Sequence, residues 1–422
     1  MPLLIPSFLW AIGLSTLRMQ LGLGSDSILS GLSGSIIAFS SLAIPLVVYA
    51  SFVSARGLSQ GQVDAAYLSG GDKVLLRYAM RSAFPLSLVT GCLGGILTLS
   101  DPGPGQILGF SGVAAEILVS FSALYDFSLA AKQSFALAAV VLIPLIPLAI
   151  WIAPRLVSGL MAKDVKPARL QRRPWASIVG PVFLLTIAST TLFLPIAGFI
   201  PPLLVEFPLE RAFQEVTRTF GNTIFYAFAA GLIASILAFV LALTVGRSRA
   251  LRQFSLGALL VILCLPPSLG ALGMIQMGSV APASLDFLLR SRFTVAVLLA
   301  LRFLPVATFL AIRGIGLSSP TWASAAAIHG VSLPRYLWKV LLPWYLPTAF
   351  LSCLLVALLA TAELNIVLLL RPPGEDSLPI AIFTVMANAP EALVSMLSLL
   401  YVTGALGVLL IGWSLAKKES SS

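Results

Sequence analysis

Charged side chains are scarce in this sequence. Only 10% of its 422 residues are Asp, Glu, Lys or Arg, whereas 58% are hydrophobic, and the mean hydropathy is +1.01. A soluble protein of this length needs more polar surface than such a composition supplies. The scarcity of charge therefore excludes a soluble globular protein and predicts a chain that lies mostly within a lipid bilayer.

Metal-binding and nucleophilic side chains are also few. The chain has one histidine, His329, and three cysteines, Cys92, Cys264 and Cys353, each within an apolar stretch. Their spacing fits neither a metal site nor a disulfide framework. The sequence also lacks a Gly-x-x-x-x-Gly-Lys-Ser/Thr phosphate-binding loop. We therefore expect no cofactor and no enzymatic activity in this chain itself.

Apolar stretches of about 20 residues, the length that crosses a bilayer, recur along the whole chain. They predict an all-α, polytopic membrane protein with about ten transmembrane helices. The start, Met1–Pro6, lacks the basic segment and cleavage site of a signal peptide and resembles the interior of a span. The predicted spans lie near residues 3–23, 30–54, 82–100, 129–153, 176–200, 222–246, 255–277, 293–312, 346–370 and 393–415.

The loops between these spans alternate in charge. Basic side chains lie in one set of loops, namely at Arg56, Lys73, Arg77, Arg81, Arg155, Lys163, Lys166, Arg169, Arg172, Arg173, Arg247, Arg249, Arg252, Arg313, Arg335, Lys339, Lys417 and Lys418. Most acids lie in the other set, at Asp101, Glu116, Glu206, Glu210, Glu215, Glu375, Asp376 and Glu391. Because basic loops stay in the cytoplasm, the C-terminus is predicted to be cytoplasmic. The formal net charge of +10 thus reflects topology and anionic lipid rather than nucleic acid.

Landmarks of the first part of the chain recur 260 residues later. Prolines within spans and glycines within loops have backbone consequences, so their coincidence is more telling than that of leucines. The matching pairs are Pro6 with Pro266, Ala11 with Ala271, Gly13 with Gly273, Pro45 with Pro305, Ala65-Ala66 with Ala325-Ala326, and Gly70 with Gly330. The pattern predicts two parallel repeats, residues 1–153 and 175–416, joined by a basic cytoplasmic linker, 154–174, and followed by a cytoplasmic tail, 417–422.

The two predicted halves are unequal. The spans near 176–200 and 222–246 have no counterpart in the first half, because their equivalents would precede Met1. The first half is therefore predicted to be two spans short. A misassigned start, a truncated gene and true loss of two helices all remain open.

Two loops on the cytoplasmic side carry the same short pattern. One contains Ser324-Ala325-Ala326, Gly330 and, after nine residues, Val340-Leu341-Leu342-Pro343. The other contains Asp64-Ala65-Ala66 and Gly70, and its later proline is Pro85. Two small alanines let a second protein approach a helix closely, and glycine can then turn the chain sharply. We predict that both loops bind partner subunits.

These loops resemble the signature loop of bacterial ABC importer permeases, which is Glu-Ala-Ala, three residues, Gly, nine residues and Ile-x-Leu-Pro. Ser324 departs from the leading glutamate, and Pro85 lies two residues late. The segments Gly221-Asn222-Thr223, Glu363-Leu364, Leu370-Arg371-Pro372-Pro373-Gly374 and Ser377-Leu378-Pro379 are similar to the fused, two-in-one permeases of iron(III) importers and their thiamine relatives.

The resemblance implies a permease of the bacterial inner membrane that receives its substrate from a periplasmic binding protein. A dimer of separate ABC ATPase subunits would dock on loops 64–70 and 324–330. Iron(III) is the substrate expected from the branch, followed by thiamine or a phosphonate. A secondary transporter driven by an ion gradient is the alternative class, since such transporters also use repeats.

Glu363 is an ionisable residue within a predicted span. Such residues usually face protein or water, and they often mark a transport path. Glu363, together with Asn365, could lie on the translocation path. It could equally pair with a neighbouring helix, through Asn365 or a backbone amide. His329 is expected to be an exposed loop residue rather than a ligand, and Glu116 and Asp126 are expected on the outer side.

Overall fold

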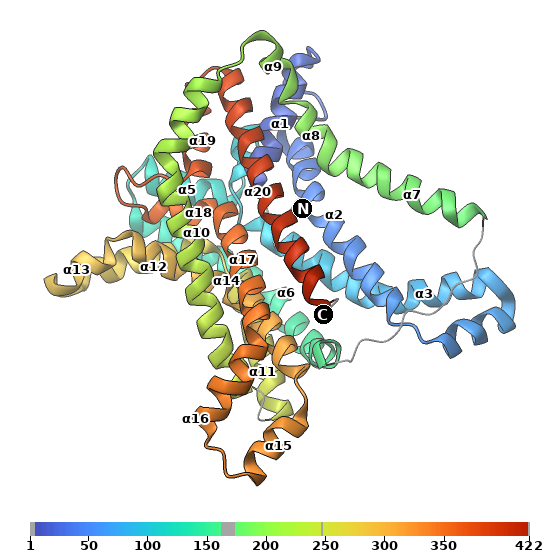
Figure 1. The fold of residues 1–422 in the computed structure, drawn as a ribbon. Helices are drawn as coiled ribbons and strands as arrows, with labels where there is room; N and C mark the ends of the chain where they lie inside the picture. The colour runs from blue at the N-terminus through green and yellow to red at the C-terminus, as the bar shows by residue number, and fades with distance from the viewer. Residues whose placement is uncertain (1–4, 162–173, 246–247, 421–422) are drawn as a thin grey trace.

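The computed structural model describes residues 5–161, 174–245 and 248–420, and within these every regular element is helical (Figure 1). The first part contains α1 (Ser7–Gln20), α2 (Gly31–Arg56), α3 (Gln60–Leu99), α4 (Gly103–Leu108), α5 (Val113–Ser122) and α6 (Phe127–Met161). A middle part contains α7 (Pro174–Ala188), a π-helical turn (Ser189–Phe193), α8 (Leu194–Ala197), α9 (Ile200–Val205), α10 (Leu209–Val245) and α11 (Arg249–Cys264).

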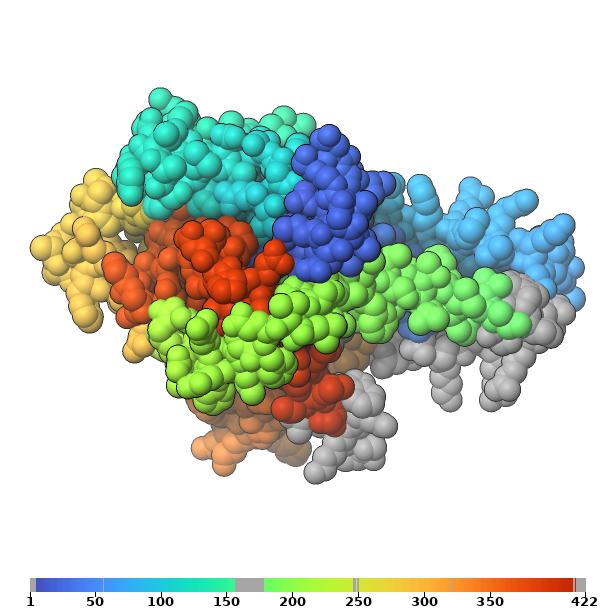
Figure 2. All heavy atoms as spheres, turned by 90° about the horizontal axis from the view of Figure 1, so that it is seen from above, coloured from blue at the N-terminus to red at the C-terminus, as the bar shows by residue number. Residues whose placement is uncertain are grey.

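The last part continues from the end of α11. It contains α12 (Pro267–Val280), α13 (Ala283–Leu289), α14 (Arg292–Gly316), α15 (Pro320–Ile328), α16 (Leu333–Tyr336), a second π-helical turn (Leu337–Leu341), α17 (Leu342–Ala362), α18 (Leu364–Leu370), α19 (Leu378–Val385) and α20 (Glu391–Ser420). Seen from above, α13 and the early part of α3 extend to opposite ends of the molecule (Figure 2).

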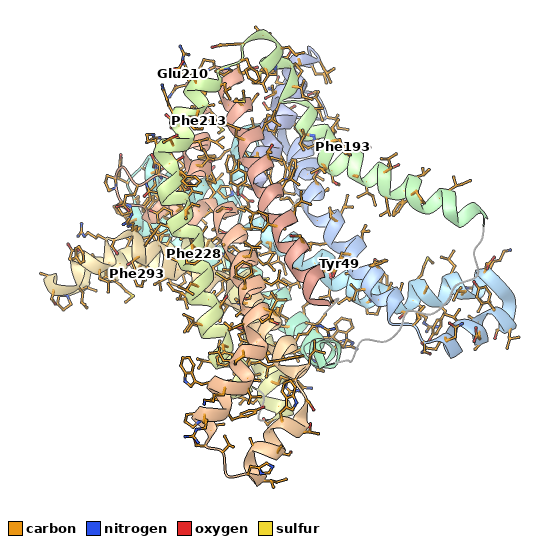
Figure 3. The ribbon with its side chains drawn as sticks, viewed as in Figure 1. Tyr49, Phe193, Glu210, Phe213, Phe228 and Phe293 are labelled. Carbon is orange, nitrogen blue, oxygen red and sulfur yellow. The ribbon has the colours of Figure 1, made fainter. Side chains whose placement is uncertain are left out.

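Eight helical segments of the described chain are long and apolar enough to cross a membrane. Figure 3 shows aromatic side chains such as Tyr49, Phe193, Phe213, Phe228 and Phe293 on several of these helices. All five are exposed, although they are large and apolar or amphipathic. Hydrocarbon is a suitable environment for them and water is not, so the protein is an all-helical, multi-pass membrane protein.

Several predicted spans are interrupted rather than continuous. The stretch 255–277 is divided between α11 and α12, which are bent by 84° at Leu265 and Pro266. A residue that precedes proline avoids helical geometry, and Leu265 accordingly has φ −60° and ψ 140°. The stretch 346–370 is divided at Glu363, where α17 ends and α18 begins. Among the described residues the count is thus eight spans, or nine with the bent pair, instead of about ten.

Other predicted boundaries also move. The stretch 3–23 contains only the 14 residues of α1, which is shorter than a bilayer span. The span predicted near 222–246 begins at Leu209, so Gly221-Asn222-Thr223 lies inside α10 and does not open it. Helix α6 runs through Met161, into the predicted linker 154–174. Residues 162–173 of that linker, like Met1–Leu4 and the last two residues of the tail 417–422, lie outside the described residues.

Helix α10 is the centre of the packing in the second part of the chain, where it lies against α14 and α17. Its buried face consists mostly of small residues, including Ala230, Ala234 and Ala238, all fully buried. At Gly231 the helices come so close that an added Cβ would lie 2.4 Å from the carbonyl oxygen of Cys353 on α17. Small residues permit such backbone contact between membrane helices, where van der Waals packing replaces the hydrophobic effect.

Helix α1 is held in a similar way by α8. An added Cβ on Gly13 would lie 2.2 Å from the carbonyl oxygen of Pro195, and one on Gly198 would lie 2.0 Å from that of Gly13. The side chains of Phe8, Leu9 and Trp10 are fully buried nearby. Helix α8 therefore packs on the first part of the chain.

Helices α2 and α14 differ in how much of their surface is covered. Only 17% of the apolar window of α2 is buried, against 56% for α14. The difference is seen at positions 260 residues apart, since Ile36 is 54% exposed where Ala296 is fully buried, and Phe52 is 52% exposed where Ile312 is 4% exposed. Helix α10 covers α14, and no described element covers α2 to the same extent.

The crossing of α10 and α17 can be tested with a matched pair of glycine substitutions. Gly231→Ala should destabilise the protein by about 1–3 kcal/mol, because the new methyl group forces the two backbones apart. Gly221→Ala on the same helix meets no atom within 4 Å and should be neutral or stabilising by up to about 1 kcal/mol, through helix propensity. Thermal unfolding in detergent measures both, and equal melting temperatures for the two variants would contradict the close crossing.

Candidate functional site

The second of the two predicted loops ends helix α15 in a specific hydrogen-bonded turn. Gly330 has φ 65°, the amide of Gly330 donates to the carbonyl of Ala327, and the amide of Val331 donates to the carbonyl of Ala326 at 2.9 Å. This is the Schellman arrangement, in which a left-handed residue satisfies the last helical carbonyls. Side chains strain that backbone conformation, so glycine is the residue the turn requires.

The first loop makes its turn with two glycines. Helix α3 begins with a capping box between Ser59 and Gln62 and then bends at Gly70 and Gly71, where φ is 159° and 68°. The chain continues as helix immediately afterwards. The two loops therefore share a short helix ended by glycine but differ in the turn that follows.

Most of the predicted loop residues are exposed. The exposed ones are Asp64, Ala65, Gly70, Ser324, Ala325, Gly330 and Pro343, whereas Ala66 is buried and Ala326 is half-buried. In each loop the first alanine of the pair faces outward and the second faces inward. Large apolar side chains lie beside the outward alanines, with Leu68 90% exposed and Ile328 82% exposed. Such side chains on a loop tip are typical of a protein-binding surface.

The second loop is connected to the span before it by tryptophans. The rings of Trp322 and Trp344 meet edge to face at 5.2 Å, and Trp344 Nε1 donates to the carbonyl of Gly314 at 3.3 Å. Gly314 itself allows α14 to approach α17, since an added Cβ would lie 2.7 Å from a methyl carbon of Thr348. These contacts join α15 to both α14 and α17.

The two loops lie at separate corners of the molecule. Figure 1 shows α15 and α16 at the lower tip and the bend of α3 at the far right.

A second group of candidate functional residues is buried where interrupted helices meet. Arg302 of α14 pairs with Glu363, with 3.2 Å between Nε and Oε2, and the two side chains are only 10% and 11% exposed. Arg302 Nη1 also donates to the carbonyl of Leu265, at the break between α11 and α12. The arginine thus joins the break at Leu265 to the break at Glu363.

The first part of the chain contributes its own break to this centre. Asp101 follows the end of α3, accepts hydrogen bonds from the amide of Gly103 and the side chain of Ser7, and interacts electrostatically with Arg302 and Glu363. The side-chain amide of Asn365 donates to the carbonyl of Ser100 at 3.1 Å. The two predicted path residues, Glu363 and Asn365, therefore lie in one centre, but Glu363 pairs with Arg302 and not with Asn365. We call Asp101, Arg302 and Glu363 the ionic centre.

Arg302 and Asp101 are members of this centre that the sequence had not singled out. Arg302 is the one charged residue within the predicted span 293–312, and a lone charge in an apolar run marks a buried partner. That signal was present for Arg302. Asp101 gave no such signal, because it follows an apolar run in a position typical of a loop.

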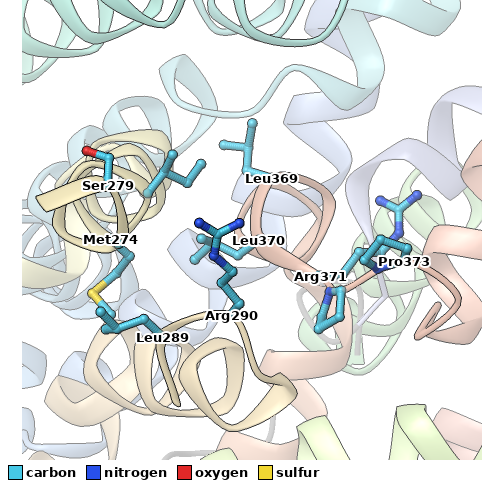
Figure 4. Close-up of a pocket in the computed structure, with 11 residues that line it drawn as sticks. Met274, Ser279, Leu289, Arg290, Leu369, Leu370, Arg371 and Pro373 are labelled. Carbon is cyan, nitrogen blue, oxygen red and sulfur yellow. The ribbon is translucent and has the colours of Figure 1, made fainter. Parts of the chain in front are cut away.

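A pocket of about 340 Å³ lies between α12, α13 and the end of α18 (Figure 4). Arg290 extends into it among apolar side chains such as Met274, Leu289 and Leu369. Arg290 pairs with Asp286, and Arg371 on the other side pairs with Asp376. Within the described residues no group of three or more His, Cys, Asp or Glu side chains is placed to hold a metal ion.

No family model matches this sequence, and no curated protein matches it significantly.

The buried pair can be tested against an exposed one. Arg302→Leu leaves Glu363 buried and unpaired, so it should cost about 3–5 kcal/mol, and Arg302→Leu with Glu363→Leu should recover most of that loss. Arg290→Leu breaks an exposed pair and should cost less than about 1 kcal/mol. Denaturant unfolding in detergent micelles measures all three, and an Arg302→Leu variant no less stable than Arg290→Leu would contradict the burial of the pair.

Proposed function

We propose that this chain is the membrane-spanning permease of an ATP-driven ABC importer, with both membrane halves in one polypeptide. The observation that carries the proposal is the pair of exposed, glycine-terminated loops at 64–70 and 324–330. They lie 260 residues apart, they resemble the loops that bind ATPase subunits in such importers, and each exposes a large apolar side chain at its tip. A dimeric ATPase on these loops and a periplasmic binding protein on the opposite side are the partners.

The order of the helices supports two parallel halves. The starts of α1 and α12 differ by 260 residues, those of α2 and α14 by 261, those of α4 and α18 by 261, and those of α6 and α20 by 264. Each set has a helix after a proline, a long span, a loop, a second span, a break and a short helix. This regularity favours duplication over a chance similarity of apolar segments.

The two halves differ in how they are covered. The face that α10 occupies on α14 is exposed on α2 at positions such as Ile36. The proposal also includes a cytoplasmic C-terminus and a location in the bacterial inner membrane.

ATP-driven closure of the partner subunits would bring the two loops together and change which side of the membrane the halves open to. The receptor and ATP bias this equilibrium through their different affinities for the two states. The substrate we propose is iron(III), with thiamine or a phosphonate next. This choice is based on the resemblance of the segments around Glu363 and Arg371.

The ionic centre favours a second candidate function, a secondary transporter driven by an ion gradient. Interrupted helices with buried charged groups at their breaks are typical of such transporters. The parallel orientation of the predicted repeats favours the importer, because inverted repeats are common in secondary transporters. The importer predicts transport that needs ATP and is unaffected by an uncoupler. The secondary transporter predicts transport that an uncoupler abolishes.

The proposed partner contact is tested by replacing Gly330, and Gly22 as a control, because both glycines end their helices in the same left-handed turn. Gly330→Val puts a β-branched residue at φ 65° and should strain the end of α15 by about 1–2 kcal/mol. We expect recovery of the ATPase subunit with the tagged protein, purified from native membranes, to fall about tenfold, which is what 1.4 kcal/mol of binding energy corresponds to.

Gly22→Val is the matched control for strain. Gly22 also has φ 65°, and it ends α1 with the same two hydrogen bonds, from Gly22 to Met19 and from Leu23 to Arg18. This variant should retain the ATPase. The assignment of loop 324–330 is wrong if Gly330→Val retains the ATPase as well as Gly22→Val does, and the importer proposal fails if the unmodified protein retains none.

A further inference from the structure

A groove lies on the surface between α6 and α11, which belong to different parts of the chain. Its volume is about 490 Å³, and Gln253 is the one polar side chain among those that line it. Small residues lie where the helices approach each other, since an added Cβ on Gly257 would lie 3.9 Å from the Cβ of Ala153 and 4.0 Å from the carbonyl oxygen of Ala149. The two helices therefore meet without filling the space beside them.

The groove is open to the surroundings of the protein. Ile146, Ile150 and Phe254 line it, and all three side chains are exposed. Apolar side chains of a membrane helix that are exposed in this way contact lipid hydrocarbon. An apolar hollow of this size among them has room for a hydrocarbon chain.

The length of the groove matches the thickness of one leaflet. The groove runs from Ile146 to Pro154 on α6 and from Ala250 to Val261 on α11. At about 1.5 Å per residue these stretches are about 12 Å and about 16 Å long. The hydrocarbon of one leaflet is about 15 Å thick, half of that of the bilayer. These dimensions fit a single acyl chain that lies along both helices.

A basic side chain is held at the end of the groove where Pro154 lies. Arg155 donates from Nη1 to the carbonyl of Trp151 at 2.6 Å, and its guanidinium carbon lies 3.9 Å from the centroid of the Trp151 ring. Tryptophan and arginine are typical of the level of the lipid headgroups. The two contacts hold the charge of Arg155 one helical turn back, beside the groove.

The two helices that form the groove contain no acidic residue. Neither Phe127–Met161 (α6) nor Arg249–Cys264 (α11) includes Asp or Glu, and the first turn of α11 contributes Arg249 and Arg252. Arg252 directly precedes Gln253, which lines the groove. Basic pockets between membrane helices bind anionic headgroups. The groove thus combines an apolar channel with a positive end.

We propose that the groove between α6 and α11 binds one anionic phospholipid, with an acyl chain against Ala153 and Gly257 and the phosphate near Arg155 and Arg252. The lipid comes from the leaflet on the side of the basic loops, and it contacts both parts of the chain at once. The site goes beyond the proposed function and does not depend on it.

The headgroup is tested with phosphatidylglycerol and phosphatidylcholine that have the same acyl chains. Each lipid is titrated into the purified full chain in neutral detergent, and bound lipid is measured by native mass spectrometry. Phosphatidylglycerol should bind about tenfold more tightly, and Arg155→Gln should weaken its binding about fivefold, since one basic residue near a membrane surface contributes about this much. Arg335→Gln, at an exposed base on α16 that does not line the groove, is the control and should bind as the parent does.

Glycerol 3-phosphate distinguishes a lipid site from a site for a soluble anion, because it carries the phosphate without acyl chains. In molar excess it should leave phosphatidylglycerol bound. The proposal is overturned if glycerol 3-phosphate displaces the lipid, if the two lipids bind alike, or if Arg335→Gln weakens binding as much as Arg155→Gln does.

The position of the acyl chain is tested by filling the groove. Gly257→Leu and, independently, Ala258→Leu put a large side chain where the acyl chain would lie, so each should weaken the binding of both lipids about tenfold. Gly404→Leu on α20 is the control, since an added Cβ there meets no atom within 4 Å. A monodisperse Gly257→Leu or Ala258→Leu variant that binds lipid as well as Gly404→Leu would refute the site. Because only this chain is present, failure of the ATPase contact leaves these outcomes unchanged.

Discussion

A backbone that leaves its helix within a bilayer must find hydrogen-bond partners inside the protein. This chain interrupts several apolar helices, and the interruptions at Ser100–Asp101, Leu265 and Glu363 are brought to one place. There the carbonyl of Leu265 accepts from Arg302 and the carbonyl of Ser100 accepts from Asn365. The need to satisfy these groups determines which helices meet, and the packing of α10 on α14 and of α1 on α8 surrounds that meeting point.

Much of the fold could be predicted from hydropathy alone. The long spans α2, α6, α14 and α20 lie close to the apolar runs that predicted them, because a run of about 20 apolar residues has few other places to go. The breaks were not predicted, since hydropathy does not register a change of direction. The proline pair after Leu265 contained that information, because proline removes a donor and restricts the residue before it.

The candidate site was predicted in part. The sharp turn at Gly330 could be predicted because a helix ends there, and the left-handed conformation of Gly330 agrees with that prediction. The inward orientation of Ala66 could not be read from the motif, because it depends on how α3 packs. Glu363 was identified as an unusual charge, but its partner, Arg302, is 61 residues away in sequence. Only the packing of α14 beside the break at Glu363 brings the two together.

The second loop is joined to the buried centre through α14 and α17. Trp322 and Trp344 link the second loop to α14, and the same helix carries Arg302 into the ionic centre. The most direct test is the distance between spin labels at Leu68 and Ile328, the exposed tips of the two loops, in a cysteine-free background with the ATPase partner. The account predicts that ATP shortens this distance and that hydrolysis restores it. A distance that is the same with and without ATP would contradict it.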